Sequence, residues 1–173
     1  MTSIMDMIIV TGGSKEGDRD FSSVEVFEDR VWHIDPALEL TSARYGHCAV
    51  EYRNKLIIMG GISLRNVINL VEILDLNETA AGWSTLTSMI VARAYSACGV
   101  VEYGGITGVM VTGGWNVVEF LDSVEFLNLE DYQGWEVVPS LLSARSKHTM
   151  ATVGGLTLVV AGFSGIMTLL NIL

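Results

Sequence analysis

Three arginines recur along the chain, each directly after an alanine: Arg44, Arg93 and Arg145. A histidine stands three residues after the first and the third of them, at His47 and His148. Guanidinium groups bind carboxylates through paired, charge-assisted hydrogen bonds. A metal site would need a further ligand near the two histidines, and no aspartate or cysteine recurs with both of them. These residues therefore predict ion pairing with acidic groups and no metal site.

The arginines belong to a longer repeat with a period of about fifty residues. An apolar run ends in two small residues four times: Gly12-Gly13, Gly60-Gly61, Gly113-Gly114 and Ala161-Gly162. Between these marks a Val-Glu pair (Glu25, Glu72, Glu125), a tryptophan (Trp32, Trp83, Trp135) and then the arginine follow in the same order. Each unit reads as four short strands, because its apolar runs are rich in β-branched residues and bounded by turn formers.

A four-stranded antiparallel unit at this period is typical of a β-propeller blade. The order of the marks, with Arg44-Tyr45-Gly46-His47 at the entry to strand one, resembles the kelch repeat. The resemblance covers nearly the whole chain, about three and a half repeats. It implies an all-β, kelch-type propeller fragment in a single domain, residues 1–173. We expect the three tryptophans to be buried between blades, and Asn77 to lie between strands three and four, opposite the arginines.

In an up-and-down blade, the connection into strand one and the connection from strand two to strand three lie at the same end. One face should therefore gather Arg44, Arg93, Arg145, Tyr45, His47, Tyr95, Ser96, His148, Arg65, Asn66, Trp115 and Asn116, near Ser14 and Lys15. The resemblance implies that this face holds a peptide of a partner protein, and three arginines would suit an acidic one. Alternatively, each arginine pairs with a glutamate of the repeat or with a carbonyl and is structural.

Catalysis is not expected from these residues. Related propellers include copper-radical oxidases, but such a site needs several His and Tyr ligands together, and the chain has 3 histidines. The sequence contains neither a phosphate loop nor a nucleophile elbow. We therefore predict no catalytic residue and no cofactor, with a sugar or alcohol oxidase as the enzyme alternative.

The charge of the chain bears on its partners. Ten Lys+Arg against 20 Asp+Glu give a net charge of -10, which disfavours nucleic acid and anionic membranes. Residues 149–173 contain no charged side chain and would be long enough to span a bilayer. They coincide with the fourth strand two and are interrupted by glycines, so we expect strands there. The tail Ile166 to Leu173 extends beyond the repeat and would form an exposed, adhesive edge.

Cys48 and Cys98 are too few for a disulfide framework and lack metal-ligand spacing, so we expect buried thiols in a reducing compartment. Residues 1–10 have no basic start and no cleavage-like end, so no signal peptide is expected. The sequon Asn77-Glu78-Thr79 points the other way. We predict a cytoplasmic protein, with an extracellular one as the alternative.

The resemblance implies a protein–protein interaction module. Its commonest setting is the substrate-recognition part of a cullin-type ubiquitin ligase adaptor, in which a BTB domain precedes the propeller; no such domain is present in this sequence. A cytoskeletal or extracellular scaffold is the alternative. The chain begins in strand two of one blade and stops after strand two of another. Ring closure would therefore need further blades of a longer gene product or a second copy in a homodimer.

Overall fold

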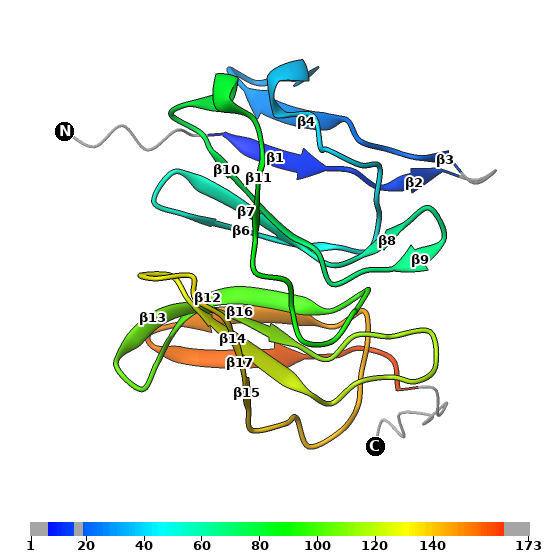
Figure 1. Cartoon of the computed structure of the whole chain (residues 1–173), viewed down its shortest axis with the longest axis vertical. Helices are drawn as coiled ribbons and strands as arrows, with labels where there is room; N and C mark the ends of the chain where they lie inside the picture. Colours follow the sequence, from blue (N-terminus) through cyan, green and yellow to red (C-terminus); the bar gives the residue numbers. More distant parts are fainter. Residues whose placement is uncertain (1–6, 16–18, 165–173) are drawn as a thin grey trace.

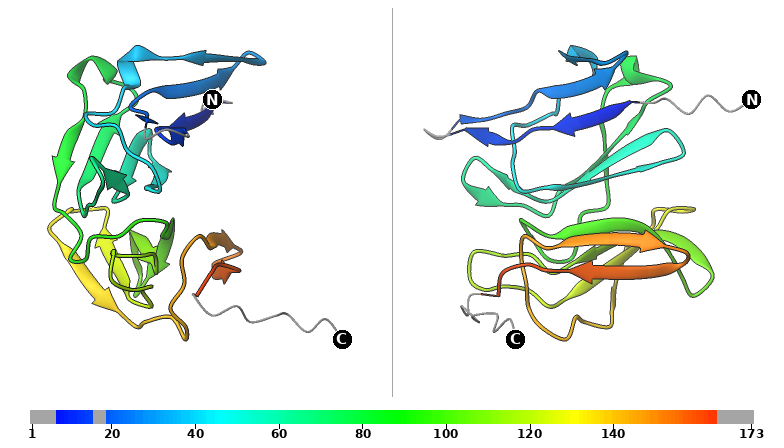
Figure 2. Two further views of the ribbon diagram at one scale, coloured as in Figure 1. Left: turned by 90° about the vertical axis from the view of Figure 1, so that its right-hand side faces the viewer. Right: turned by 180° about the vertical axis from the view of Figure 1, so that it is seen from behind.

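The computed structural model describes residues 7–15 and 19–164, which form antiparallel sheets that follow one another along an arc (Figures 1 and 2). The first blade consists of β1 (Ile8–Thr11), β4 (Val24–Glu28) and β5 (Val31–Ile34). The second consists of β6 (Cys48–Tyr52), β7 (Lys55–Met59), β10 (Val71–Asp75) and β11 (Ser84–Leu86). The third consists of β12 (Ala97–Tyr103), β13 (Ile106–Thr112), β14 (Val124–Asn128) and β15 (Trp135–Val138). The fourth contributes β16 (Thr149–Val153) and β17 (Leu156–Val160).

Smaller elements join these strands. Two hairpins extend the connections from strand two to strand three: β2 (Ser14–Lys15) with β3 (Arg19–Asp20), and β8 (Ile62–Ser63) with β9 (Asn66–Val67). Two short 3-10 helices, η1 (Pro36–Leu38) and η2 (Thr79–Ala81), lie next to strand four of the first and second blades. The described chain is thus all-β, and the order of strands within the second and third blades confirms the predicted four-stranded antiparallel unit.

The core lies between successive blades, because alternate residues of a strand point to opposite faces of its sheet. In β7, Ile58 belongs with Leu74 of its own blade to a cluster that contains Val24 of the first blade. The next residue along, Ile57, belongs instead to the cluster that contains Val109 of the third blade. The inner strands of the blades therefore read as continuous apolar runs rather than alternating ones.

The tryptophans fill these gaps only where a preceding blade is present. The indole N–H of Trp135 donates to the carbonyl of Thr87 at 2.9 Å, and that of Trp83 donates to the carbonyl of Leu38 at 3.2 Å. Trp135 is buried and Trp83 half-buried. The expectation for Trp32 was wrong: it is 49% exposed and packs on Phe27 of its own blade, since no earlier blade lies among the described residues.

The glycine doublet joins neighbouring blades through the backbone. The N–H of Gly61 donates to the carbonyl of Arg93 in the next repeat at 2.9 Å. Gly60 has φ +65°, and a Cβ on it would lie 2.4 Å from the same carbonyl oxygen. Gly13 and Gly114 donate in the same way to the arginine carbonyl of the repeat that follows each of them. The doublet is required because one backbone must both turn left-handed and approach another closely.

The two cysteines contradict the expectation of free thiols. Cys48 in β6 and Cys98 in β12 form a disulfide with their Cα atoms 6.0 Å apart. Their spacing in sequence, 50 residues, corresponds to one repeat. The cysteines therefore lie on β6 and β12, the first strands of adjacent blades, which lie side by side. The argument for a reducing compartment therefore falls away.

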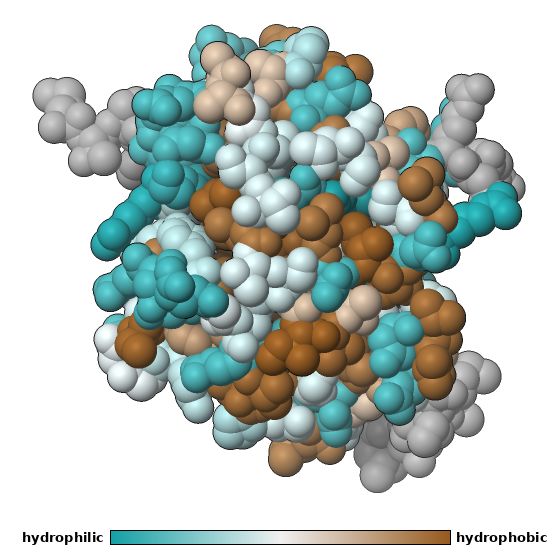
Figure 3. All heavy atoms as spheres, in the orientation of Figure 1, coloured by the Kyte–Doolittle hydropathy of each residue, from teal (hydrophilic) through white to brown (hydrophobic). Residues whose placement is uncertain are grey.

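The end blades leave apolar side chains exposed. Ile8, Val10 and Ile34 are exposed on the first blade, as are Leu156 and Val160 on the fourth. Apolar residues are also visible among polar ones over the middle of the molecule in Figure 3. Ring closure through a homodimer or through further blades stays a prediction.

The C-terminal apolar segment is a hairpin as far as the structure describes it, with β16 paired to β17. Across the described residues, no helix is long and apolar enough to cross a membrane. The predicted tail, Ile166 to Leu173, lies outside the described residues.

Candidate functional site

Two of the three repeated arginines are structural. Arg44 and Arg93 are fully buried, and they form ion pairs with Glu72 and Glu125 of the blade that each arginine enters. Burial lowers the pKa of Arg93 below its ordinary value, and the nearby carboxylate of Glu125 opposes this shift. These two arginines cannot contact a partner, so their assignment to the binding face was wrong and the alternative of pairing with a repeat glutamate is confirmed for them.

Each ion pair also anchors the connection that brings the chain into the blade. The carboxylate of Glu125 accepts hydrogen bonds from the N–H groups of Ile90 and Val91, at 2.7 and 3.0 Å. Arg93 donates in addition to the carbonyls of Gly113 and Ser123. In the second blade, Thr41 donates its hydroxyl hydrogen to Glu72 in the corresponding way.

The third arginine is in a different environment. Arg145 is half-buried and donates to the carbonyls of Ser143 and Ala161, at 3.4 and 2.9 Å. Strand three of its own blade would follow residue 164, outside the described residues. Glu25, the repeat glutamate of the first blade, is exposed.

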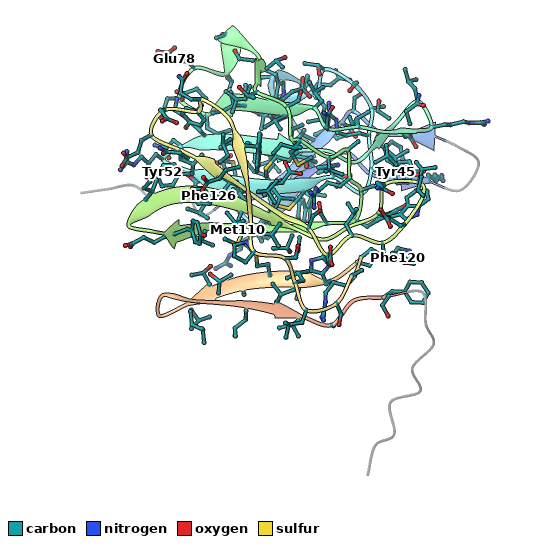
Figure 4. All side chains as sticks on the ribbon, turned by 60° about the horizontal axis from the view of Figure 1, so that its bottom comes forward. Tyr45, Tyr52, Glu78, Met110, Phe120 and Phe126 are labelled. Carbon is teal, nitrogen blue, oxygen red and sulfur yellow. A yellow bond between two sulfur atoms is a disulfide. The ribbon has the colours of Figure 1, made fainter. Side chains whose placement is uncertain are left out.

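The connections into strand one and those after strand two lie at one end of the blades, as predicted. Tyr45, Ala94 and Ser146, which directly follow the arginines, form backbone bridges to Ile62, Trp115 and Phe163, which directly follow the small-residue pairs. We call this end, formed by the two hairpins, residues 113–122 and the three arginine connections, the hairpin face. Figure 4 shows Tyr45 and Phe120 at this end and Tyr52 and Glu78 at the other.

A row of aromatic and charged groups crosses the hairpin face. The rings of Tyr45 and Tyr95 meet edge to face, with centroids 6.3 Å apart. The ammonium of Lys147 lies 5.0 Å above the Tyr95 ring, within the range of a cation–π contact. Partial burial raises the pKa of Tyr95, and Tyr45 and Asp20 raise it further. Backbone bonds from Tyr95 to Gly46 and from Lys147 to Tyr95 hold this row in place.

Beside this row, a cleft of about 530 Å³ opens between the two hairpins. It is lined by Ser14, Asp20, Ser42, Ala43, Tyr45, Ser63, Leu64 and Arg65. The lining thus combines hydroxyl groups with one carboxylate, one guanidinium and the apolar side chains of Ala43 and Leu64. Such a mixture suits a peptide, since polar groups orient a ligand while an apolar contact supplies much of the binding energy.

Leu64, the larger apolar side chain in this cleft, was not among the residues predicted from the sequence. Leu64 and Arg65 form the tip of the β8–β9 hairpin with φ of +48° and +66°, a conformation that costs non-glycine residues energy. Asn66 supports the tip by donating its side-chain N–H to the carbonyl of Leu64. Leu64 is 84% exposed. The only signal in the sequence was the position of Leu64 between two polar residues, Ser63 and Arg65, outside the apolar runs of the repeat.

A second hollow of about 430 Å³ lies between residues 116–123 and the connections at Val91 and Ala144. Asn116 lines it and accepts from the N–H groups of Val118 and Glu119, which shapes this loop. Trp115 is half-buried and forms bridges to both Ala94 and Phe120. This loop lies at the hairpin face, but its polar atoms mostly hold its own backbone.

The two histidines bond between blades. His47 Nε2 lies 2.7 Å from the hydroxyl of Thr11, and His148 Nε2 lies 2.8 Å from that of Thr112. Each threonine precedes the glycine doublet of the preceding blade. Ser96 takes the equivalent place in the third blade, and its buried hydroxyl has no partner within the described structure. Over residues 7–15 and 19–164, no cluster of three His, Cys, Asp or Glu side chains could hold a metal ion.

Acid should destabilise the fold through His47. Burial lowers the pKa of His47 to about 4, the charge of Arg44 lowers it further, and the Thr11 contact opposes these shifts. Since the unfolded pKa is about 6.5, the unfolded state binds more protons between these values, and stability falls as pH falls through that window. From about pH 7 to 4, the wild type should lose on the order of 2 kcal/mol more than His47→Gln, by urea unfolding. His33→Gln, on exposed β5, is the control; equal losses in wild type and His47→Gln would contradict the prediction.

Comparison with known proteins agrees with this architecture. No family model matches the chain. The chain is similar to Kelch-like protein 23 of Homo sapiens, with 27% identity over 147 residues that cover 83% of this chain and 24% of the relative. It therefore spans about a quarter of the length of that relative. The similarity agrees with the repeat and the all-β blades in suggesting a kelch-type segment.

Proposed function

We propose that the chain is a protein-recognition module that holds an extended peptide segment in the cleft between the β2–β3 and β8–β9 hairpins. The observation that carries this proposal is the exposed Leu64 at the tip of the second hairpin, which lies beside a cleft lined by four hydroxyl groups.

The chemistry of the cleft also revises the expected ligand. An acidic peptide was predicted from three arginines, but Arg44 and Arg93 are neutralised inside the blades. The cleft itself contains one acidic and one basic side chain, Asp20 and Arg65. We therefore propose a peptide of little net charge with an apolar anchor for Leu64 and Tyr45. Nucleic acid and membranes remain unexpected partners because of the net charge of -10.

Two cellular settings follow from different observations. The similarity to a kelch-like protein suggests the substrate-recognition part of a cullin-type ubiquitin ligase adaptor. The disulfide between Cys48 and Cys98 instead favours an extracellular scaffold, since disulfides persist in oxidising compartments. We propose the second setting. A BTB segment in the upstream reading frame of the gene would favour the first, whereas a signal peptide there would favour the second.

Selection from a random peptide library displayed on phage tests the cleft directly. Peptides enriched on the immobilised chain should lose binding about tenfold or more on Leu64→Asp and on Tyr45→Ser, because central contacts dominate the energy of such interfaces. Val31→Asp makes the same apolar-to-acidic change at an exposed site at the other end of the first blade. Fluorescence polarisation with synthetic peptides measures the affinities, and circular dichroism checks that the variants fold. Peptides that bind the Leu64 and Val31 variants equally well would disprove the site.

A further inference from the structure

The sequon Asn77-Glu78-Thr79 lies in the turn between β10 and β11, where an oligosaccharide would have room. Asn77 and Glu78 are exposed, and Figure 4 places Glu78 at the end of the molecule away from Tyr45. The sequence contains no other Asn-X-Ser/Thr triplet. The corresponding turn of the first blade is the tight pair Asp29-Arg30, and that of the third blade, residues 129–134, has no asparagine.

The local geometry leaves the asparagine amide accessible. The backbone N–H and the side-chain Nδ2 of Asn77 both donate to Asp75 Oδ1, at 2.9 and 3.1 Å. The side-chain bond lies at the surface, so giving it up to solvent or to an enzyme costs little. The backbone then leaves the turn through η2, closed by Ala81 N–H donating to the carbonyl of Glu78. The sequon is therefore presented on an exposed turn, as an acceptor site requires.

A second, independent observation points to the compartment in which this modification occurs. The disulfide joins β6 to β12 on two other strands, and its formation needs an oxidising environment. A reduced cytosol would provide neither the disulfide nor the glycan, whereas the secretory pathway provides both. The disulfide and the glycan thus both require that the chain passes through the secretory pathway, although they lie in different elements.

We propose that Asn77 carries an N-linked oligosaccharide, added in the secretory pathway. In this transfer, Nδ2 of Asn77 forms a bond to the anomeric carbon of the sugar and loses a proton. The bond between that carbon and the diphosphate of a lipid-linked oligosaccharide donor breaks, and the lipid diphosphate leaves. The glycan projects from the end opposite the hairpin face, so it covers the turn between β10 and β11 and leaves the peptide cleft open. This proposal does not depend on the proposed peptide-binding function.

Mass spectrometry of the protein purified from its natural source tests the proposal. Trypsin releases residues 66–93 as one peptide, because no Lys or Arg lies between Arg65 and Arg93. Treatment with a peptide N-glycosidase in heavy-oxygen water should convert Asn77 to labelled aspartate in this peptide. Without reductant, residues 45–53 should be recovered joined to residues 94–145 through the two cysteines. An unmodified Asn77, or cysteines that react with an alkylating reagent before reduction, would overturn the proposal.

Variants of the full chain secreted from cultured animal cells behind an added signal peptide test the site itself. The wild type and Thr79→Ser should show a slower-migrating form that the glycosidase removes, since serine preserves the sequon. Asn77→Gln and Thr79→Ala should lose that form completely. Thr85→Ala, which removes an exposed threonine of β11 outside the sequon, should keep it. Loss of the glycan in Thr79→Ser or Thr85→Ala, or its absence from the wild type, would count against the assignment.

Discussion

Replacing Arg93 with methionine should lower the free energy of unfolding by about 3–5 kcal/mol, because it leaves the carboxylate of Glu125 buried without a cation. Both side chains are fully buried, and the guanidinium lies 2.5 Å from the carboxylate. Urea unfolding followed by tryptophan fluorescence measures the change. The double variant Arg93→Met/Glu125→Gln should regain part of the loss, since it removes the buried charge and its amide oxygen still accepts from one of the two N–H groups, those of Ile90 and Val91, that bond to the carboxylate.

A surface ion pair of the same chain is the matched control. Lys55 and Asp75 lie 2.6 Å apart on β7 and β10, but their side chains are 37% and 34% exposed. Lys55→Met should therefore change stability much less than Arg93→Met, because solvent and salt screen an exposed pair. If the two methionine variants were equally stable, Arg93 would not be the structural anchor that its burial indicates. It would then return to the candidates for ligand contact.

The disulfide should account for a similar share of the stability. Cross-linking residues 50 apart removes loop-closure entropy from the unfolded chain worth about 4 kcal/mol. The double variant Cys48→Ser/Cys98→Ser should lose about that much in urea unfolding at neutral pH. A reductant should lower the unfolding midpoint of the wild type toward that of the double variant.

The reductant must leave the double variant unchanged, which separates the disulfide from other effects of the reagent. The single variants should resemble the double one, because either substitution opens the bond. A wild-type midpoint that does not respond to the reductant, with both thiols free to alkylation, would mean that the two cysteines are reduced in solution. It would also remove the main support for an oxidising compartment.

Most of the fold could be predicted from the repeat. The small-residue pairs mark the ends of β1, β7, β13 and β17, and the Val-Glu pairs fall in β4, β10 and β14. Each mark expresses a local requirement: a left-handed turn, an apolar strand or a large wedge. Local requirements are visible in sequence because they restrict the residue types at their own positions. Trp32 shows the limit, since its exposure depends on a neighbouring blade rather than on its own strand.

The candidate site was predicted only in part. The end at which the connections gather follows from strand order, and Tyr45, Tyr95 and Arg65 lie at that end; their contact with a partner stays a prediction. Arg44 and Arg93 have the same residue type and spacing as a ligand-binding set would have. Nothing in their spacing distinguishes a guanidinium aimed at solvent from one aimed at a carboxylate inside the blade. Leu64 is not at any of the positions whose residue type recurs from repeat to repeat.

By itself, the sequence determined the repeat, the strands within each blade and the end at which their connections meet, because periodicity and turn chemistry act over a few neighbouring residues. Only the tertiary structure decided which side chains are buried and paired inside the blades and are therefore not available to a partner. Packing one blade on the next buries Arg93 against Glu125 and brings Cys48 to Cys98 across one whole repeat. These contacts depend on distances between residues far apart in the chain, which spacing along the sequence does not specify.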